Sequence, residues 1–189
     1  MGNYKLTYLP FCEHYVFGKA TRVKFAKVIH ETQNQLDYIH SDLWGTSWVP
    51  LIGGARYFLT LIDDYSRKVW IYFLKNKSET FLKFKEWKIL VETQVGRKVK
   101  KLRTNNGLEF LSNDFNSFYQ KKGIATHTTV RYTPQQNGLA ERMNRTILER
   151  VRCMLSSSGL SKVFWAKAAE TTIHLINRSP SSALQFKTP

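Results

Sequence analysis

A near-continuous apolar run, Tyr57-Phe-Leu-Thr-Leu-Ile-Asp63, constrains the fold of this chain more than any other segment. Apolar residues at successive positions are typical of a strand that is buried on both faces of a sheet. A polar turn over 64–67 and a second apolar run over 68–74 follow directly. The two runs therefore predict an antiparallel hairpin at the heart of a covered sheet.

The segments around this hairpin alternate between strand and helix patterns. A short strand is predicted over 37–43, before the hairpin. After the hairpin, helices are predicted over 78–95, 112–122, 139–155 and 161–177, the first of them capped by Ser78. Two further strands are predicted over 98–104 and 125–130. A loop rich in Pro and Gln occupies 131–138. This order predicts an α/β domain of RNase H-like fold, with a five-stranded mixed sheet flanked by helices.

Charge narrows the range of partners. The chain has 29 Lys and Arg against 14 acids, a formal net charge of +15, which favours binding to a polyanion such as nucleic acid. The alternative is a basic but inert surface. Residues 1–36 are basic and lack periodicity, so we interpret them as an extended arm before a core over 37–189. No apolar run approaches the roughly 20 residues that cross a bilayer, and no membrane partner is expected.

Two acids stand where metal ligands are expected. Asp42 lies at the C-terminal end of the first predicted strand, and Glu141 lies in the first turn of a long helix. Such a carboxylate pair can hold Mg²⁺, and two such ions can activate an attacking oxygen and stabilise a leaving one. The alternative is an ordinary pair of Glu141 with Arg145 one helical turn away, worth only about 0.3 kcal/mol. Spacing alone leaves both interpretations open.

Five motifs occur in a fixed order, namely His40–Gly45, Tyr57–Arg67, Leu102–Phe110, Thr133–Thr146 and Leu175–Pro180. Together they resemble the integrase core of a copia-type retrotransposon Pol polyprotein, especially the plant kind. The resemblance covers roughly 37–189. It implies DNA as the partner, Mg²⁺ or Mn²⁺ as the cofactor, DNA strand transfer as the reaction and a homo-oligomer as the working form. It also implies an intracellular protein, nuclear or cytoplasmic, with the nucleus suggested by the family alone.

The family uses two Asp and one Glu, the last two with 35 residues between them. The resemblance places Asp42 first and Glu141 third, as the metal ligands, and the middle position falls on Asn105 with that spacing intact. Asn offers only a neutral carbonyl where Asp offers a charged acceptor, so metal binding is predicted to be weakened. A loss of about 3–5 kcal/mol in transition-state stabilisation would slow the reaction several hundred- to several thousand-fold. Rescue by Glu109 or Asp114 is the alternative.

Both ends depart from the family. These proteins carry a His-His-Cys-Cys zinc module upstream, but Tyr15 stands here in place of its second paired cysteine, three residues after Cys12, and no His precedes Cys12. Because a structural zinc site needs Cys or His at every corner, no zinc is expected. Residues 1–36 are then a remnant of that region. The chain ends at Pro189 within a family motif, which we interpret as a fragment of a decayed element.

Basic and amide side chains near these acids are the predicted DNA contacts. Lys100 and Lys101 flank the fourth strand, and the loop over 132–138 resembles the mobile loop that precedes the catalytic Glu in integrases. By that likeness Gln135, Asn137 and Arg145 join the two lysines as candidates. The alternatives are a solubilising face for the lysines and turn capping for the amides.

Two main hypotheses follow. The first is an integrase that transfers DNA strands, and the second is a non-catalytic nucleic-acid-binding remnant that keeps the fold and the basic surface. Residue 105 favours the second. A third possibility is that the fragment does not stay folded.

Overall fold

A computed structural model describes residues 32–105, 107–129 and 137–189. Its strands are β1 (Ile39–Trp44), β2 (Tyr57–Asp63), β3 (Val69–Leu74), β4 (Lys101–Thr104) and β5 (Ala125–Thr128). Its α-helices are α2 (Thr80–Val95), α3 (Asn113–Lys122), α4 (Gly138–Ser158) and α5 (Trp165–Ile176). Short 3₁₀ turns lie at Lys77–Glu79, Leu108–Phe110, Lys162–Phe164 and Ser182–Leu184.

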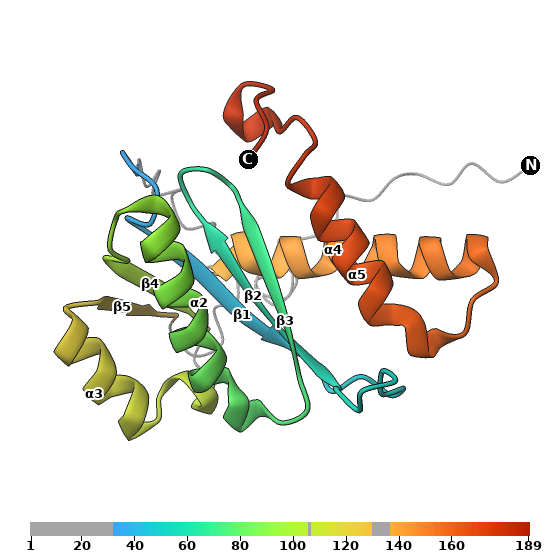
Figure 1. The fold of residues 1–189 in the computed structure, drawn as a ribbon, viewed down its shortest axis with the longest axis horizontal. Coiled ribbons are helices and arrows are strands. Elements are labelled where there is room, and N and C mark those ends of the chain that lie inside the picture. Colours follow the sequence, from blue (N-terminus) through green and yellow to red (C-terminus); the bar gives the residue numbers. More distant parts are fainter. Residues whose placement is uncertain (1–31, 106, 130–136) are drawn as a thin grey trace, which may run out of the picture. The chain divides into compact units, whose positions relative to one another are not determined.

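The five strands form one mixed sheet in the order β3-β2-β1-β4-β5 (Figure 1). The predicted hairpin is confirmed, because β2 pairs antiparallel with β3 and also with β1. β4 pairs parallel with β1 on one side and with β5 on the other. β1 is therefore the central strand, with the long antiparallel ribbon on one edge and the shorter parallel pair on the other.

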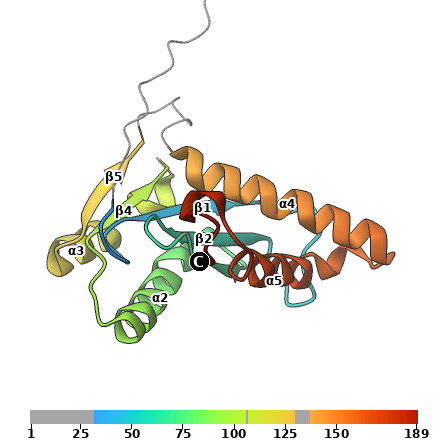
Figure 2. The ribbon, with the colours of Figure 1, turned by 90° about the horizontal axis from the view of Figure 1, so that it is seen from above.

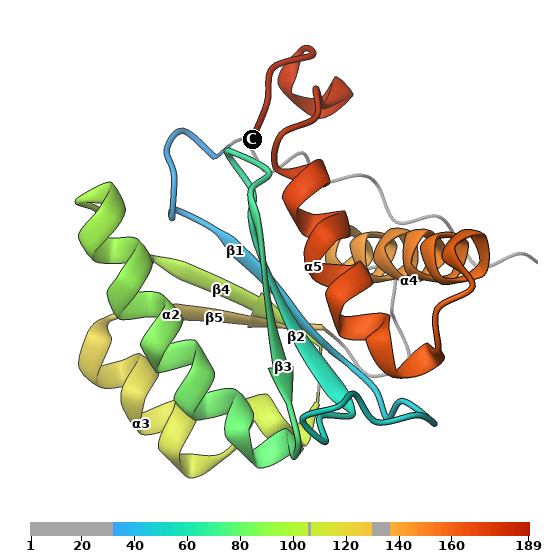
Figure 3. The same cartoon turned by 45° about the vertical axis from the view of Figure 1, so that its right-hand side comes forward.

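Helices cover both faces of the sheet, as the apolar run of β2 predicts. Figures 2 and 3 show α2 and α3 on one side of the strands and α4 and α5 on the other. Leu59 and Leu61 of β2 pack under α2 and α3, whereas Phe58 and Ile62 pack under α4 and α5. This alternation places odd-numbered β2 side chains in one core and even-numbered ones in the second.

The predicted helices are present with small shifts at their ends. Ser112 caps α3 by accepting a hydrogen bond from the backbone of Phe115, as the sequence pattern predicts. The predicted cap at Ser78 is wrong. Asn76 and Glu79 form a capping box around a 3₁₀ turn, and α2 begins after it at Thr80.

The described core includes residues before position 37. Leu36, which the sequence analysis assigned to the basic arm, is 1% exposed and packs with Ile39 in the core under α2. Its backbone N–H donates to Asp63, and Thr32 donates through its hydroxyl to Asp64. The rest of the predicted arm, residues 1–31, lies outside the described residues. In the part that the structure describes, no helix is long and apolar enough to span a membrane.

Candidate active site

Asp42 lies in the central strand and faces α4. Side chains alternate along a strand, and Trp44, two residues on, packs in the core under α4 and α5, so Asp42 points to the same face. Asp42 is 9% exposed. Burial, together with the nearby charge of Glu141, raises the pKa of its carboxyl to about 7. An acid with this pKa is only partly ionised at neutral pH.

Asn105 lies beside Asp42 because of the strand register. His40 of β1 pairs with Arg103 of β4 in parallel register. Asp42 lies two positions after His40, and Asn105 lies two positions after Arg103. The Nδ2 of Asn105 donates a hydrogen bond of 2.8 Å to the Oδ1 of Asp42. The Oδ1 of Asn105 accepts from the backbone N–H of Gly107 at 3.1 Å. The amide thus presents a donor to Asp42, where an aspartate would present a second negative charge.

Asn144 holds the other oxygen of Asp42. Its Nδ2 donates to the Oδ2 of Asp42 at 2.9 Å, and its Oδ1 accepts from the hydroxyl of Thr60 at 2.9 Å. Asn144 is buried, at 4% exposure. Its hydrogen bond lowers the pKa of Asp42 and so opposes the larger effects of burial and of the Glu141 charge, which raise it. The sequence analysis missed this residue. Its one signal is position: a polar residue three after Glu141 falls on the adjoining helix face.

Glu141 lies half-buried in the first turn of α4, where the helix dipole favours a negative charge. Burial raises the pKa of Glu141, and the charges of Arg145 and Arg142 oppose that rise. Among the described residues no ion pair joins Glu141 to Arg145 within 4 Å, although their charges interact. Asp42 of β1 and Glu141 of α4 are therefore close enough for their charges to interact, and the amide of Asn105, just after β4, bonds Asp42.

The family model described as "Integrase core domain" matches residues 33–134, more than half of the chain. The chain belongs to the integrase core family. It is 47% identical over 94% of its length to the Retrovirus-related Pol polyprotein from transposon TNT 1-94 of Nicotiana tabacum. It is also 33% identical over 94% of its length to the corresponding polyprotein from transposon RE2 of Arabidopsis thaliana. The chain spans 13% and 12% of the lengths of these two relatives.

Solved integrases share the fold. The HTLV-2 integrase catalytic core domain, in complex with magnesium and in a trimeric form, matches 84% of this chain and 96% of its own, with a TM-score of 0.61 and 20% identity. The simian T-cell lymphotropic virus intasome in complex with PP2A regulatory subunit B56 gamma matches 74% of this chain and 48% of its own, with a TM-score of 0.58 and 20% identity. The predicted RNase H-like fold is confirmed.

The donor set of this integrase core fits a divalent cation only in part. Asp42 and Glu141 supply carboxylate oxygens, which Mg²⁺ prefers, and Asn105 has a carbonyl oxygen to add. The negative charge of Glu141 raises the pKa of Asp42, and a bound cation would neutralise that charge. Within the described ranges, however, no group of three or more His, Cys, Asp or Glu is placed to hold a metal. Asp42 and Glu141 supply two negative charges here, and Asn105 adds none.

Glu109 and Asp114, the alternative third acids, lie in different places. The carboxylate of Glu109 turns back over Gly107, where an added Cβ would lie 2.6 Å from Glu109 Oε1 and 2.9 Å from Asn105 Oδ1. Its charge is the smallest of the causes that raise the pKa of Asp42. Asp114 is exposed in the first turn of α3. Only Glu109 therefore adds negative charge near Asn105.

The predicted DNA contacts are spread over two elements. Lys101 is exposed at the start of β4, and Lys100 just before it bonds Asp37 at 2.7 Å. Arg145 is exposed on α4. Asn137 is fully buried, and its Nδ2 donates to the backbone oxygen of Ser41 at 3.2 Å, which ties the start of α4 to β1. Gln135 lies outside the described residues, as does the region around Cys12, where no zinc is expected.

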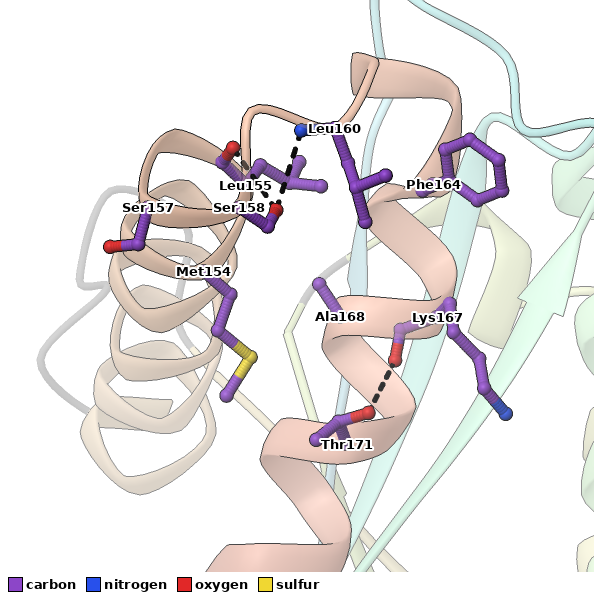
Figure 4. Close-up of a pocket in the computed structure, with 9 residues that line it drawn as sticks. All are labelled: Met154, Leu155, Ser157, Ser158, Leu160, Phe164, Lys167, Ala168 and Thr171. Carbon is purple, nitrogen blue, oxygen red and sulfur yellow. Dashed lines mark hydrogen bonds between the residues drawn. The ribbon is translucent and has the colours of Figure 1, made fainter.

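A cavity of about 510 Å³ lies elsewhere, between the end of α4 and the start of α5 (Figure 4). Its walls are mainly apolar and hydroxyl side chains, and Lys167 is the one charged group among the lining residues Met154, Leu155, Ser157, Ser158, Leu160, Phe164, Lys167, Ala168 and Thr171. It contains no carboxylate or histidine. The acids of the candidate site lie at the opposite end of α4, so this cavity takes no part in their chemistry.

Proposed function

We propose that this chain is the catalytic core of a retrotransposon integrase that binds DNA and whose strand-transfer activity is crippled by Asn105. The observation that carries the proposal is the hydrogen bond from Asn105 to Asp42, because it replaces a charged metal ligand by an amide donor. Asp42 and Glu141 are the residues that would hold Mg²⁺ or Mn²⁺. When bound, such a cation would activate an attacking oxygen and stabilise a leaving oxygen.

The chain's own residues set up the site in defined ways. Asn144, held by Thr60, fixes the orientation of the Asp42 carboxylate and favours its charged form. Arg145 and Arg142 favour the charged form of Glu141. Asn105 also donates to Asp42, but its amide occupies a lone-pair direction of Asp42 that a cation would need, and it adds no charge. We therefore expect one weakly held cation at this site and a rate several hundred- to several thousand-fold below that of the Asp variant.

The second candidate function is binding of DNA without catalysis. The same hydrogen bond favours it, since Asn105 leaves the fold and the basic side chains of Lys101 and Arg145 intact. In this case the chain binds DNA with the steep salt dependence of phosphate contacts and shows no metal-dependent reaction. Self-association, as in the trimeric and intasome forms of the structural neighbours, is proposed for either function.

A disintegration assay on branched DNA with Mn²⁺ tests the proposal. The unaltered chain, Asn105→Asp and Asn105→Asp/Glu141→Gln are compared at equal concentration. Activity that appears only in Asn105→Asp supports an integrase site disabled at residue 105. Robust and equal activity in the unaltered chain and in Asn105→Asp contradicts the disabled site. DNA binding by all three without activity in any supports the second function.

A further inference from the structure

The loop between β1 and β2, residues 45–56, presents two large apolar side chains to solvent. Trp48 is 96% exposed and Ile52 is 76% exposed. The other four tryptophans of the chain are partly or fully buried, and they are Trp44, Trp70, Trp87 and Trp165. Exposure of an entire indole ring is unusual, because burying a tryptophan removes a large apolar surface from water. The ring of Trp48 is thus available to a partner on both faces.

The backbone that carries Trp48 is held in place. The N–H of Ser47 donates to the carbonyl of Arg56 at 2.7 Å, and the N–H of Leu51 donates to the carbonyl of Ala55 at 3.1 Å. The indole N–H of Trp165, at the start of α5, donates to the carbonyl of Val49 at 3.0 Å. These bonds fix the residues on both sides of Trp48. The backbone at Trp48 therefore loses little conformational freedom when the ring binds.

Cations surround the loop. The Nη1 of Arg56 lies 3.4 Å from the carbonyl of Ser47, the peptide unit that leads into Trp48. The Cε of Lys75 lies 3.9 Å from the position that a Cβ on Gly54 would take, and the ammonium of Lys77 lies 5.9 Å from the ring centre of Tyr57. In the described residues none of these three cations is in an ion pair within 4 Å.

Glu79, which lies near Lys75, already accepts hydrogen bonds from the backbone. Glu79 accepts hydrogen bonds through its carboxylate from the backbone N–H groups of Lys75 and Asn76 in the capping box. An exposed ring flanked by unpaired cations is the arrangement by which proteins hold single-stranded nucleic acid, with a base on the ring and phosphates on the cations. The positive charge around the loop therefore favours a polyanion, rather than an apolar protein surface, as its binding partner.

We propose that the β1–β2 loop binds an unpaired nucleobase of DNA, with Trp48 stacked on the base and Arg56, Lys75 and Lys77 facing the adjoining phosphates. The proposal rests on the proposed function, because it assumes DNA at the acidic site. Trp48 lies six positions after Asp42, so their Cα atoms lie at most about 22 Å apart. A DNA strand held near Asp42 can reach the loop within a few nucleotides.

An unpaired base fits this loop better than a duplex does. Bases in a duplex are stacked on both faces and offer no ring surface to an indole, whereas an unpaired base exposes its π-face whatever its identity. The contact would therefore tolerate any sequence and would require a single-stranded end, a flap or a flipped base. Duplex binding is expected to depend on cations elsewhere on the chain.

The test uses the full 189-residue chain and two fluorescent DNAs, a blunt duplex and the same duplex with a five-nucleotide single-stranded overhang. Affinities are measured by anisotropy for the unaltered chain, Trp48→Ala, Trp48→Phe and Ile89→Ala. Ile89 is a matched control, 68% exposed on α2. Stacking of one base predicts that Trp48→Ala loses about tenfold in affinity for the overhang DNA and leaves blunt duplex binding unchanged. Trp48→Phe should retain most of the affinity, and Ile89→Ala all of it.

The outcomes separate this inference from the proposed function. Equal binding of the overhang DNA by Trp48→Ala and the unaltered chain overturns the inference and leaves the proposed function standing. A change of oligomeric state in Trp48→Ala, with unchanged DNA affinity, overturns it in favour of a contact with a second copy. Failure of the unaltered chain to bind either DNA overturns both. Quenching of exposed tryptophan fluorescence by the overhang, absent in Trp48→Phe, supports the inference independently.

Discussion

The amide of Asn105 donates a hydrogen bond of 2.8 Å to one carboxylate oxygen of Asp42. The other oxygen of Asp42 accepts from Asn144, so a buried acid is held by two amides. Both contacts depend on the parallel register of β1 and β4 and on the packing of α4 over β1. The proposed integrase site, with one charge missing, rests on these two contacts.

Asn144→Ala should destabilise the chain. The change leaves a hydroxyl of Thr60 and an oxygen of Asp42 buried without this partner, at an expected cost of about 1–3 kcal/mol. Urea unfolding measures the difference. Asn116→Ala serves as control, because Asn116 is exposed on α3 and donates to a backbone carbonyl at 3.3 Å. A loss as large in the control as in Asn144→Ala would contradict the role given to Asn144.

Asp63→Asn should weaken the attachment of the segment that precedes β1. The carboxylate of Asp63 accepts from the backbone N–H of Leu36 at 2.9 Å and from the N–H and hydroxyl of Ser66 at 2.9 and 2.7 Å. An Asn supplies one acceptor only, so the stability should fall by about 1–3 kcal/mol. Amide hydrogen exchange at Leu36 should rise with it. Asp114→Asn, at an exposed position, should change neither quantity.

Acid should destabilise the chain through Asp64. Burial raises the pKa of Asp64, but the hydrogen bond from His40 and the charge of Arg67 outweigh burial, so its pKa lies below the ordinary value. The unfolded state then takes up the proton first, and stability is lost as pH falls from about 5 through the lowered pKa. Unfolding free energies measured between pH 3 and 7 should fall less steeply for Asp64→Asn. Parallel curves for both proteins would contradict this assignment.

Binding of duplex DNA should depend on the predicted basic contacts through phosphate charge. Lys101→Ala and Arg145→Ala should each reduce the slope of log affinity against log salt concentration by about 0.9, the effect of one lost phosphate contact. Lys167→Ala is the control, because Lys167 lies on α5 and is paired with Glu170 at 3.3 Å. Slopes are obtained from anisotropy titrations at several salt concentrations. An equal reduction in the control would indicate a diffuse effect of charge.

The fold was largely predictable because its strongest signals are local. The apolar run of β2, the Ser112 cap of α3 and the four-residue apolar steps of α4 each specify an element without reference to the rest of the chain. The exact ends of the helices were harder to predict from the sequence. Ser78 matches a helix cap as well as Asn76 does, and only the bonds between Asn76 and Glu79 decide between them.

Residues of the candidate site could be predicted only where their spacing along the sequence matched the family motif. The resemblance assigned Asn105 and Asp42 to one site, and the structure brings the two side chains together. Asn144 was missed because its role needs Thr60, which lies 84 positions away and meets it only in the folded chain. Asn137 was predicted as a DNA contact, but its side chain is buried and bonds β1. The sequence could not show this, because a polar residue before a helix looks the same whether it bonds a neighbouring strand or faces a ligand.

Titration with Mn²⁺, followed by the electron paramagnetic resonance signal of the free ion, tests the central claim most directly. The unaltered chain is compared with Asn105→Asp and with Asn116→Asp, which adds the same charge at an exposed position. The account predicts that Asn105→Asp binds Mn²⁺ at least about tenfold more tightly than the other two, because only position 105 places the new charge beside Asp42. Equal binding by all three would contradict the claim that Asn105 disables the metal site.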